Sequence, residues 1–150
     1  MAIPLQFTLT GDYQASFILD SDPTPDDGIG GLYFTIWDVP GFDDAVFGVA
    51  DVSFFSSGFG GGLGIEDFYG LNTLVVTDGP QLYTGTEEAP TFLTGTFALT
   101  EYQGSGTYTL TISELTADVP EPASWAMMLG GFGAIGGAMR SRRKTSVSFG

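Results

Sequence analysis

Adjacent carboxylates are the side chains of this sequence with the clearest potential for chemistry. They occur at Asp43–Asp44, Glu66–Asp67 and Glu87–Glu88. Two carboxyl groups about 5–10 Å apart can cleave a glycosidic bond, one as the acid and the other as nucleophile or base. Neighbouring residues of a strand point to opposite faces of a sheet, so these pairs make poor catalytic dyads. We therefore expect that the protein is not an enzyme, with a polysaccharide-active hydrolase as an alternative.

A second group of carboxylates crowds residues 20–28, whose sequence is Asp-Ser-Asp-Pro-Thr-Pro-Asp-Asp-Gly. Carboxylate oxygens are ligands that Ca²⁺ prefers, so one interpretation is a Ca²⁺ site, and no other cofactor is expected. The ligands would be Asp20, Asp22, Asp26 and Asp27. The EF-hand loop pattern fails, because Pro25 replaces the required glycine and no Glu closes the loop. The other interpretation is a solvated connection between strands.

The distribution of charge excludes several classes of function. The 150 residues carry 18 acidic and 4 basic side chains, and the basic ones all lie between Arg140 and Lys144. An acidic body of this kind repels phosphate backbones, which excludes nucleic acid as a partner. The chain has no Cys and no His, which excludes disulfides, thiolate or imidazole metal sites, and Ser–His or Cys–His catalysis.

Alternating apolar and polar residues predict short β-strands. Leu5, Phe7 and Leu9 alternate with polar residues, and a second alternating set follows a short turn, as in a hairpin. Another hairpin is predicted over residues 94–113, and a third around the turn at residues 78–80. The many turns and the lack of a helical period favour an all-β body, an antiparallel β-sandwich or jelly roll.

The end of the chain differs from everything before it. After an acidic β body at residues 1–118, the sequence contains a Pro-Glu-Pro motif at 120–122, an uncharged apolar run at about 123–139, a basic cluster at 140–144 and a polar tail at 145–150. As a helix, the apolar run would span about 25 Å, slightly less than the ~30 Å hydrocarbon core of a membrane. Flanking tryptophan and arginine side chains can cover the difference. We therefore expect a single C-terminal hydrophobic transmembrane helix.

Small and basic residues give this predicted helix a packing face and an orientation. Gly133 and Gly137 form a small-residue stripe of the kind that packs against another membrane helix. Under the positive-inside rule the basic cluster stays in the cytoplasm and the β body lies across the membrane. The residues of this stop-transfer cluster are Arg140, Arg142, Arg143 and Lys144.

These segments, in this order, resemble the PEP-CTERM protein-sorting domain. The residues that carry its signature are Pro120, Glu121, Pro122 and Trp125, followed by the apolar run and the arginine cluster. The resemblance covers residues 119–144 and is closest to versions from exopolysaccharide-producing Gram-negative bacteria. It implies that an exosortase, a membrane enzyme, recognises the tail and processes the chain at or near Pro-Glu-Pro. The protein would lie in the inner membrane during export, and then in the periplasm, at the cell surface or outside the cell.

Proteins of this family normally begin with an export signal peptide. No basic segment followed by an apolar stretch stands at the start of this sequence. We therefore expect the signal peptide to be missing from this chain, with the true start of translation further upstream.

The sequence favours one function for this protein and leaves two alternatives. We expect an exported protein of the cell surface, exopolysaccharide or biofilm, with a structural or adhesive body. Its expected partners are an exosortase, the inner membrane and extracellular polysaccharide. The alternatives are a carbohydrate- or Ca²⁺-binding module and, as above, a polysaccharide-active hydrolase.

Overall fold

The computed structural model describes residues 2–115 of the chain. Within them the backbone forms strands and one short 3₁₀ helix, and no α-helix. The elements are β1 (Pro4–Gly11), β2 (Ala15–Asp20), β3 (Asp27–Ile29), β4 (Tyr33–Pro40), β5 (Val49–Phe55), η1 (Ser57–Phe59), β6 (Leu63–Asp67), β7 (Asn72–Asp78), β8 (Tyr83–Gly85), β9 (Pro90–Phe92), β10 (Gly95–Glu101) and β11 (Thr107–Glu114). The predicted all-β body is confirmed.

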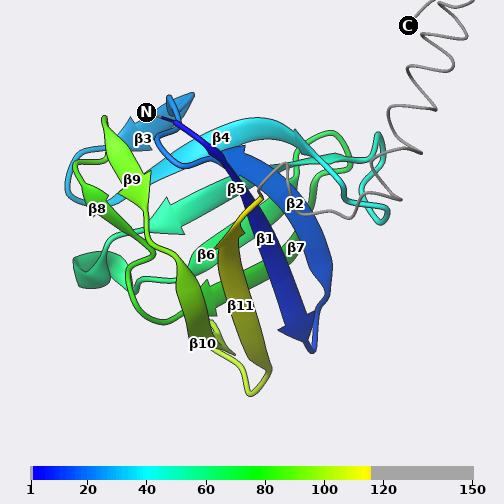
Figure 1. Ribbon diagram of the computed structural model, residues 1–150. Helices are drawn as coiled ribbons and strands as arrows, with labels where there is room; N and C mark the ends of the chain where they lie inside the picture. Colours follow the sequence, from blue (N-terminus) through cyan, green and yellow to red (C-terminus); the bar gives the residue numbers. More distant parts are fainter. Residues whose placement is uncertain (1, 116–150) are drawn as a thin grey trace, which may run out of the picture. The chain divides into compact units, whose positions relative to one another are not determined.

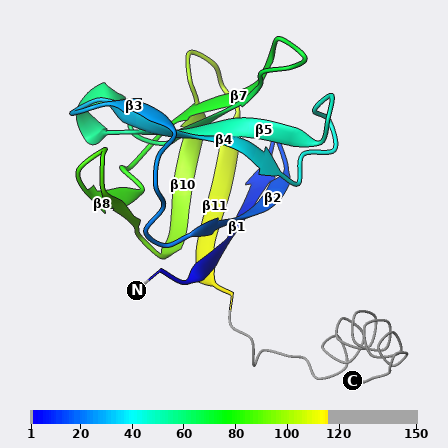
Figure 2. The same ribbon diagram turned by 90° about the horizontal axis from the view of Figure 1, so that it is seen from above.

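Nine of the strands form one antiparallel sheet in the order β2-β1-β11-β10-β7-β6-β5-β4-β3. The sheet curls on itself (Figure 1), and β10 and β7 share only a short ladder, Thr100 opposite Asp78 and Glu101 opposite Thr77. Figure 2 shows β10 and β11 running across the direction of β4 and β5. The architecture is therefore a single curled antiparallel sheet whose halves face each other, where the sequence predicted an antiparallel sandwich or jelly roll.

Aromatic side chains from both halves of the sheet fill the space between them. Phe7 of β1 and Phe54 of β5 are fully buried, with ring centroids 5.9 Å apart. Phe92 of β9 lies edge-on to both rings, at 5.0 Å from Phe7 and 4.7 Å from Phe54. Such aromatic pairs contribute about 0.5–1.5 kcal/mol each beyond the area they bury. The β8–β9 hairpin is therefore part of the core.

The predicted strand pairing is right at both ends of the body and wrong in the middle. The hairpins β1–β2 and β10–β11 form as predicted. The turn at residues 78–80 does not join a hairpin, because β7 pairs with β6 and β10 while β8 pairs with β9. The N–H of Gly79 donates to the carbonyl of Gly60 (3.0 Å), and the N–H of Gly62 donates to that of Pro80 (2.9 Å). The turn is thus bonded to the glycine-rich loop, which comprises residues 58–64.

Close packing of the backbone explains why this loop is rich in glycine. Gly61 has a φ of 64°, a left-handed conformation that favours glycine. A Cβ at this position would also overlap the carbonyl oxygen of Gly79. The loop needs its glycines so that two backbone segments can approach each other.

The predicted sorting motif, transmembrane helix at 123–139 and basic cluster lie outside the described residues. Between residues 2 and 115, no helix is long and apolar enough to cross a membrane.

Candidate functional site

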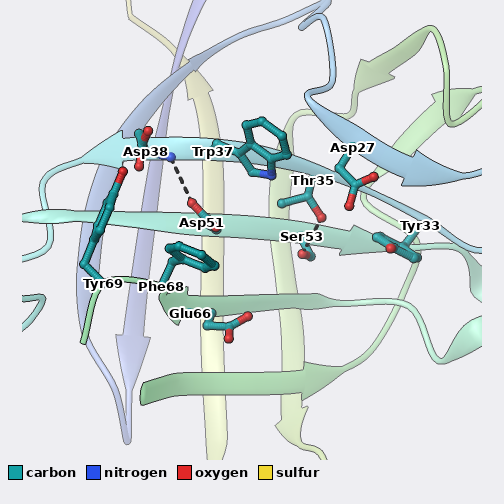
Figure 3. Close-up of a pocket in the computed structure, with 10 residues that line it drawn as sticks. All are labelled: Asp27, Tyr33, Thr35, Trp37, Asp38, Asp51, Ser53, Glu66, Phe68 and Tyr69. Atoms are coloured by element: carbon teal, nitrogen blue, oxygen red, sulfur yellow. Dashed lines mark hydrogen bonds between the residues drawn. The ribbon is translucent and has the colours of Figure 1, made fainter. Parts of the chain in front are cut away.

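A cleft of about 480 Å³ opens on the outer face of β4, β5 and β6 (Figure 3). Aromatic and acidic side chains dominate its lining, and none of the lining residues is basic. The lining residues are Asp27, Tyr33, Thr35, Trp37, Asp38, Asp51, Ser53, Glu66, Phe68 and Tyr69. Clefts of this size are typical of binding sites for small molecules.

Strand alternation places the polar residues of the cleft on its floor. Ala50 and Val52 of β5 point into the core, so Asp51 and Ser53 between and after them point outward. The Ser53 hydroxyl lies 2.7 Å from the Thr35 hydroxyl on the neighbouring strand β4. This pair of hydroxyls and the Asp51 carboxylate form a polar strip across two strands.

A β-bulge in β4 presents two further side chains to the cleft. The pairing of β4 with β5 shifts register at Trp37 and Asp38, and both residues are exposed. Asp38 has a φ of 52°, a left-handed conformation that costs a non-glycine residue about 1–2 kcal/mol. The N–H of Trp37 donates to Asp26 Oδ2 (2.8 Å), and that of Asp38 donates to Asp51 Oδ1 (3.0 Å). Two carboxylates therefore hold the bulge in place.

Asp67 builds the opposite wall of the cleft. Its side chain is 2% exposed and accepts hydrogen bonds from the N–H groups of Val46 (2.9 Å) and Gly70 (3.0 Å). Val46 belongs to the β4–β5 loop and Gly70 to the β6–β7 turn. Asp67 thus ties these segments together and fixes the turn that carries Phe68 and Tyr69.

The bulge and the wall meet at Tyr69. Figure 3 shows its phenol pointing toward the Asp38 carboxylate. The charge of Asp38 raises the pKa of Tyr69, with smaller contributions from desolvation and from a hydrogen bond to the same carboxylate. Tyr69 and Asp38 together close one end of the cleft.

Two carboxylates of the cleft stand directly opposite each other. Asp51 of β5 pairs with Glu66 of β6, and like charges in such cross-strand pairs are destabilising. We expect Glu66→Gln to raise the free energy of unfolding by about 0.2–1 kcal/mol at low ionic strength, measured by urea denaturation. The gain should shrink in about 1 M salt, where charges are screened within about 3 Å. Glu114→Gln, at an exposed position, is the control, and an equal gain there would contradict the explanation.

The four aspartates of the predicted Ca²⁺ site are not brought together. Asp20 ends β2, Asp22 accepts from the Thr91 hydroxyl (2.6 Å), Asp26 holds the bulge, and Asp27 begins β3. Among residues 2–115, no three acidic side chains are placed to hold a metal ion. The described residues therefore do not assemble the four predicted ligands, and Ca²⁺ binding by this segment stays a prediction. Because this body has no basic side chains, its carboxylates pair with backbone N–H groups and hydroxyls instead.

One of the adjacent carboxylate pairs is split between the two faces of the sheet. Glu66 is exposed and Asp67 is buried, so they point to opposite faces, as predicted. Glu87 accepts hydrogen bonds from the Tyr83 hydroxyl (2.6 Å) and the Gly31 N–H (2.7 Å), and these bonds lower its pKa. Glu87 therefore has a structural role.

Sequence reasoning missed the cleft, because its residues come from four strands and a turn. One signal was present: Asp51 interrupts the apolar run of β5 at a position that faces outward. The aromatic pair at residues 68–69 carried no such signal.

The described residues form an acidic, antiparallel all-β body with an aromatic and acidic cleft on its outer face. Residues 118–144 match the family of the PEP-CTERM protein-sorting motif. The chain therefore carries a PEP-CTERM sorting signal, which confirms the resemblance. This motif implies export, sorting to the membrane or cell surface, and processing by an exosortase. No curated protein and no solved structure matches the chain.

Proposed function

We propose that this chain is a non-enzymatic protein of the cell surface or extracellular polymer, delivered there by its C-terminal tail. The match over residues 118–144 carries the proposal. The exosortase recognises Pro120, Glu121, Pro122 and Trp125 and processes the chain nearby. The apolar run at 123–139 is the transient anchor in the inner membrane, and the basic cluster at 140–144 holds the end of the chain in the cytoplasm.

The charge distribution supports this division of the chain. Every basic residue lies in the tail, and of the 18 acidic residues only Glu121 lies beyond residue 119. A positive cluster directly after the apolar run favours cytoplasmic retention of that end. Removal of the tail would leave a strongly negative body, and repulsion between such bodies keeps them soluble.

The body acts in structure or adhesion, and its cleft favours binding over catalysis. Asp51 and Glu66 stand opposite each other on neighbouring strands, and both line the cleft, so they are the pair to consider for catalysis. A glycosidase needs a general acid in an environment that favours its protonated form, usually an apolar one. Glu66 is exposed to water, and the cleft has no basic side chain to assist. Release of reducing ends from a glycan by the purified chain, abolished by Glu66→Gln, would contradict this view.

Deletion of the exosortase tests the proposal. In cells with the enzyme, the chain, expressed behind an export signal peptide, should be shortened and leave the inner membrane. In the deletion strain, and when residues 120–122 are replaced by alanine, the unprocessed chain should accumulate in the inner membrane. Immunoblots of cell fractions measure both size and location.

The matched control is Glu114→Ala, an acidic residue shortly before the motif, which should be processed like the natural chain. Unchanged size and location in the exosortase deletion strain would refute the proposal.

A further inference from the structure

Three large aromatic side chains stand exposed around the cleft. Trp37 is 52% exposed, Phe68 58% and Tyr69 50%. Figure 3 shows Trp37 on one side of the cleft and the other two rings on the opposite side. Scattered apolar side chains are normal on a surface, but a group of them around a cleft indicates an interaction site. Their flat faces offer stacking surfaces on both sides of a bound molecule.

The polar groups of the cleft select the charge of that molecule. Asp27, Asp38, Asp51 and Glu66 all line it, with no basic residue among them. Carboxylates form strong, charge-assisted hydrogen bonds with ammonium groups, and exposed aromatic faces attract cations as well. The same carboxylates repel phosphates, sulfates and uronic acids. Charge complementarity therefore favours a cationic ligand.

The size and the remaining polar groups of the cleft indicate more than a lone cation. Its volume of about 480 Å³ is far larger than a single ammonium group needs. The hydroxyls of Thr35 and Ser53 lie on its floor, between Trp37 and Tyr33 in Figure 3. A pyranose ring presents C–H groups to aromatic faces and hydroxyls to acceptors and donors at its edge. A chain of such rings therefore uses the walls and the floor together.

We propose that this cleft binds an amine-bearing glycan, a chain of pyranose sugars with free ammonium groups. The sugar faces stack on Trp37 and on the Phe68–Tyr69 wall, and the ammonium groups lie against Asp51 and Glu66. The proposal rests on the surface role proposed above, and it names the partner class of the body.

Calorimetric titration tests the proposal with the full chain, purified in a zwitterionic detergent without a sugar headgroup. The probe is a β-1,4-linked glucosamine hexamer, and the matched neutral probe is its N-acetylated form. We expect the glucosamine hexamer to bind at least tenfold more tightly. Trp37→Ala should weaken its binding at least tenfold, and Glu66→Gln should weaken it in low salt. Tyr102→Ala is the control, because Tyr102 is 51% exposed but lies outside the cleft.

Several outcomes would overturn the proposal. One is the absence of binding of the glucosamine hexamer. Another is equal weakening by Trp37→Ala and Tyr102→Ala, which would indicate diffuse attraction to the acidic body. Equal affinity for the N-acetylated form would remove the requirement for the amine. Equal affinity for a hexalysine peptide, lost in Trp37→Ala, would show a site for basic protein segments. None of these results alters the test of sorting, which depends on processing in cells.

Discussion

Replacing Phe54 by alanine is expected to lower the free energy of unfolding by about 3–5 kcal/mol. Phe54 is fully buried, and its ring contacts those of Phe7 (5.9 Å), Phe34 (5.3 Å) and Phe92 (4.7 Å). Alanine would remove these contacts and leave a cavity, because rings fixed on separate strands cannot all move in to fill it. Urea denaturation followed by circular dichroism measures the loss.

The control is Phe59→Ala, because Phe59 has the same side chain but is 51% exposed. Phe59→Ala should change the free energy of unfolding by no more than about 0.5 kcal/mol. Similar losses for the two variants would show that the aromatic cluster is not the centre of the core. A loss of several kcal/mol is a large share of the stability of a typical domain, about 5–15 kcal/mol.

The position of Phe54 explains why so large an effect is expected at this residue. Its neighbours Phe7 and Phe34 belong to β1 and β4, which lie in different halves of the curled sheet. Phe92 comes from the separate β8–β9 hairpin. The Phe54 ring therefore contacts both halves of the curled sheet and the β8–β9 hairpin. Its removal would weaken the packing between the two halves.

The strands that the sequence predicted well are those with one face buried and one exposed. Leu5, Phe7 and Leu9 are buried in β1, and Leu110 and Ile112 are buried in β11. Alternation of this kind fixes the register, because a slip of one residue would turn every apolar side chain to water. The all-β class and both terminal hairpins were therefore predictable.

The central pairing was not predictable from local signals. Asp78-Gly79-Pro80 has the composition of a hairpin turn, but its backbone is bonded to Gly60 and Gly62 of the distant loop. Thr77 adds a side-chain contact of the same kind: its buried hydroxyl bonds both the N–H and the carbonyl of Leu63, each at 3.0 Å. Contacts between segments so far apart in the sequence depend on the whole fold.

The tail could be predicted from the sequence and the cleft could not. A sorting signal depends on the order of residues along the chain, whereas the cleft depends on how distant strands come together. A sorting signal is a linear sequence, so its order of segments was sufficient to identify it before any fold was known. The cleft depends on a bulge at Trp37 and Asp38, and so on the pairing of β4 with β5. The wall of the cleft formed by Phe68 and Tyr69 depends on Asp67. The sequence had indicated Asp67 only as one of two adjacent carboxylates, with Glu66.

Replacing Asp67 by alanine is expected to lower the free energy of unfolding by about 2–6 kcal/mol, because two N–H groups lose their acceptor and each such loss costs about 1–3 kcal/mol. These are the N–H groups of Val46 and Gly70, which alanine cannot reach. The freed turn should also let Phe68 and Tyr69 move away from the cleft. Binding of the glucosamine hexamer should therefore weaken along with stability, and both are measured on the same purified variant.

Two substitutions at neighbouring positions separate the structural carboxylate from the one that lines the cleft. Asp67→Asn keeps one acceptor oxygen, so it should lose less stability than Asp67→Ala while still falling below the natural chain. Glu66→Gln, one residue earlier and on the opposite face, should gain stability in low salt because it removes the charge opposite Asp51. Effects of opposite sign follow only if Asp67 binds the two loops while Glu66 faces a like charge. The same sign for both variants would contradict this assignment of roles.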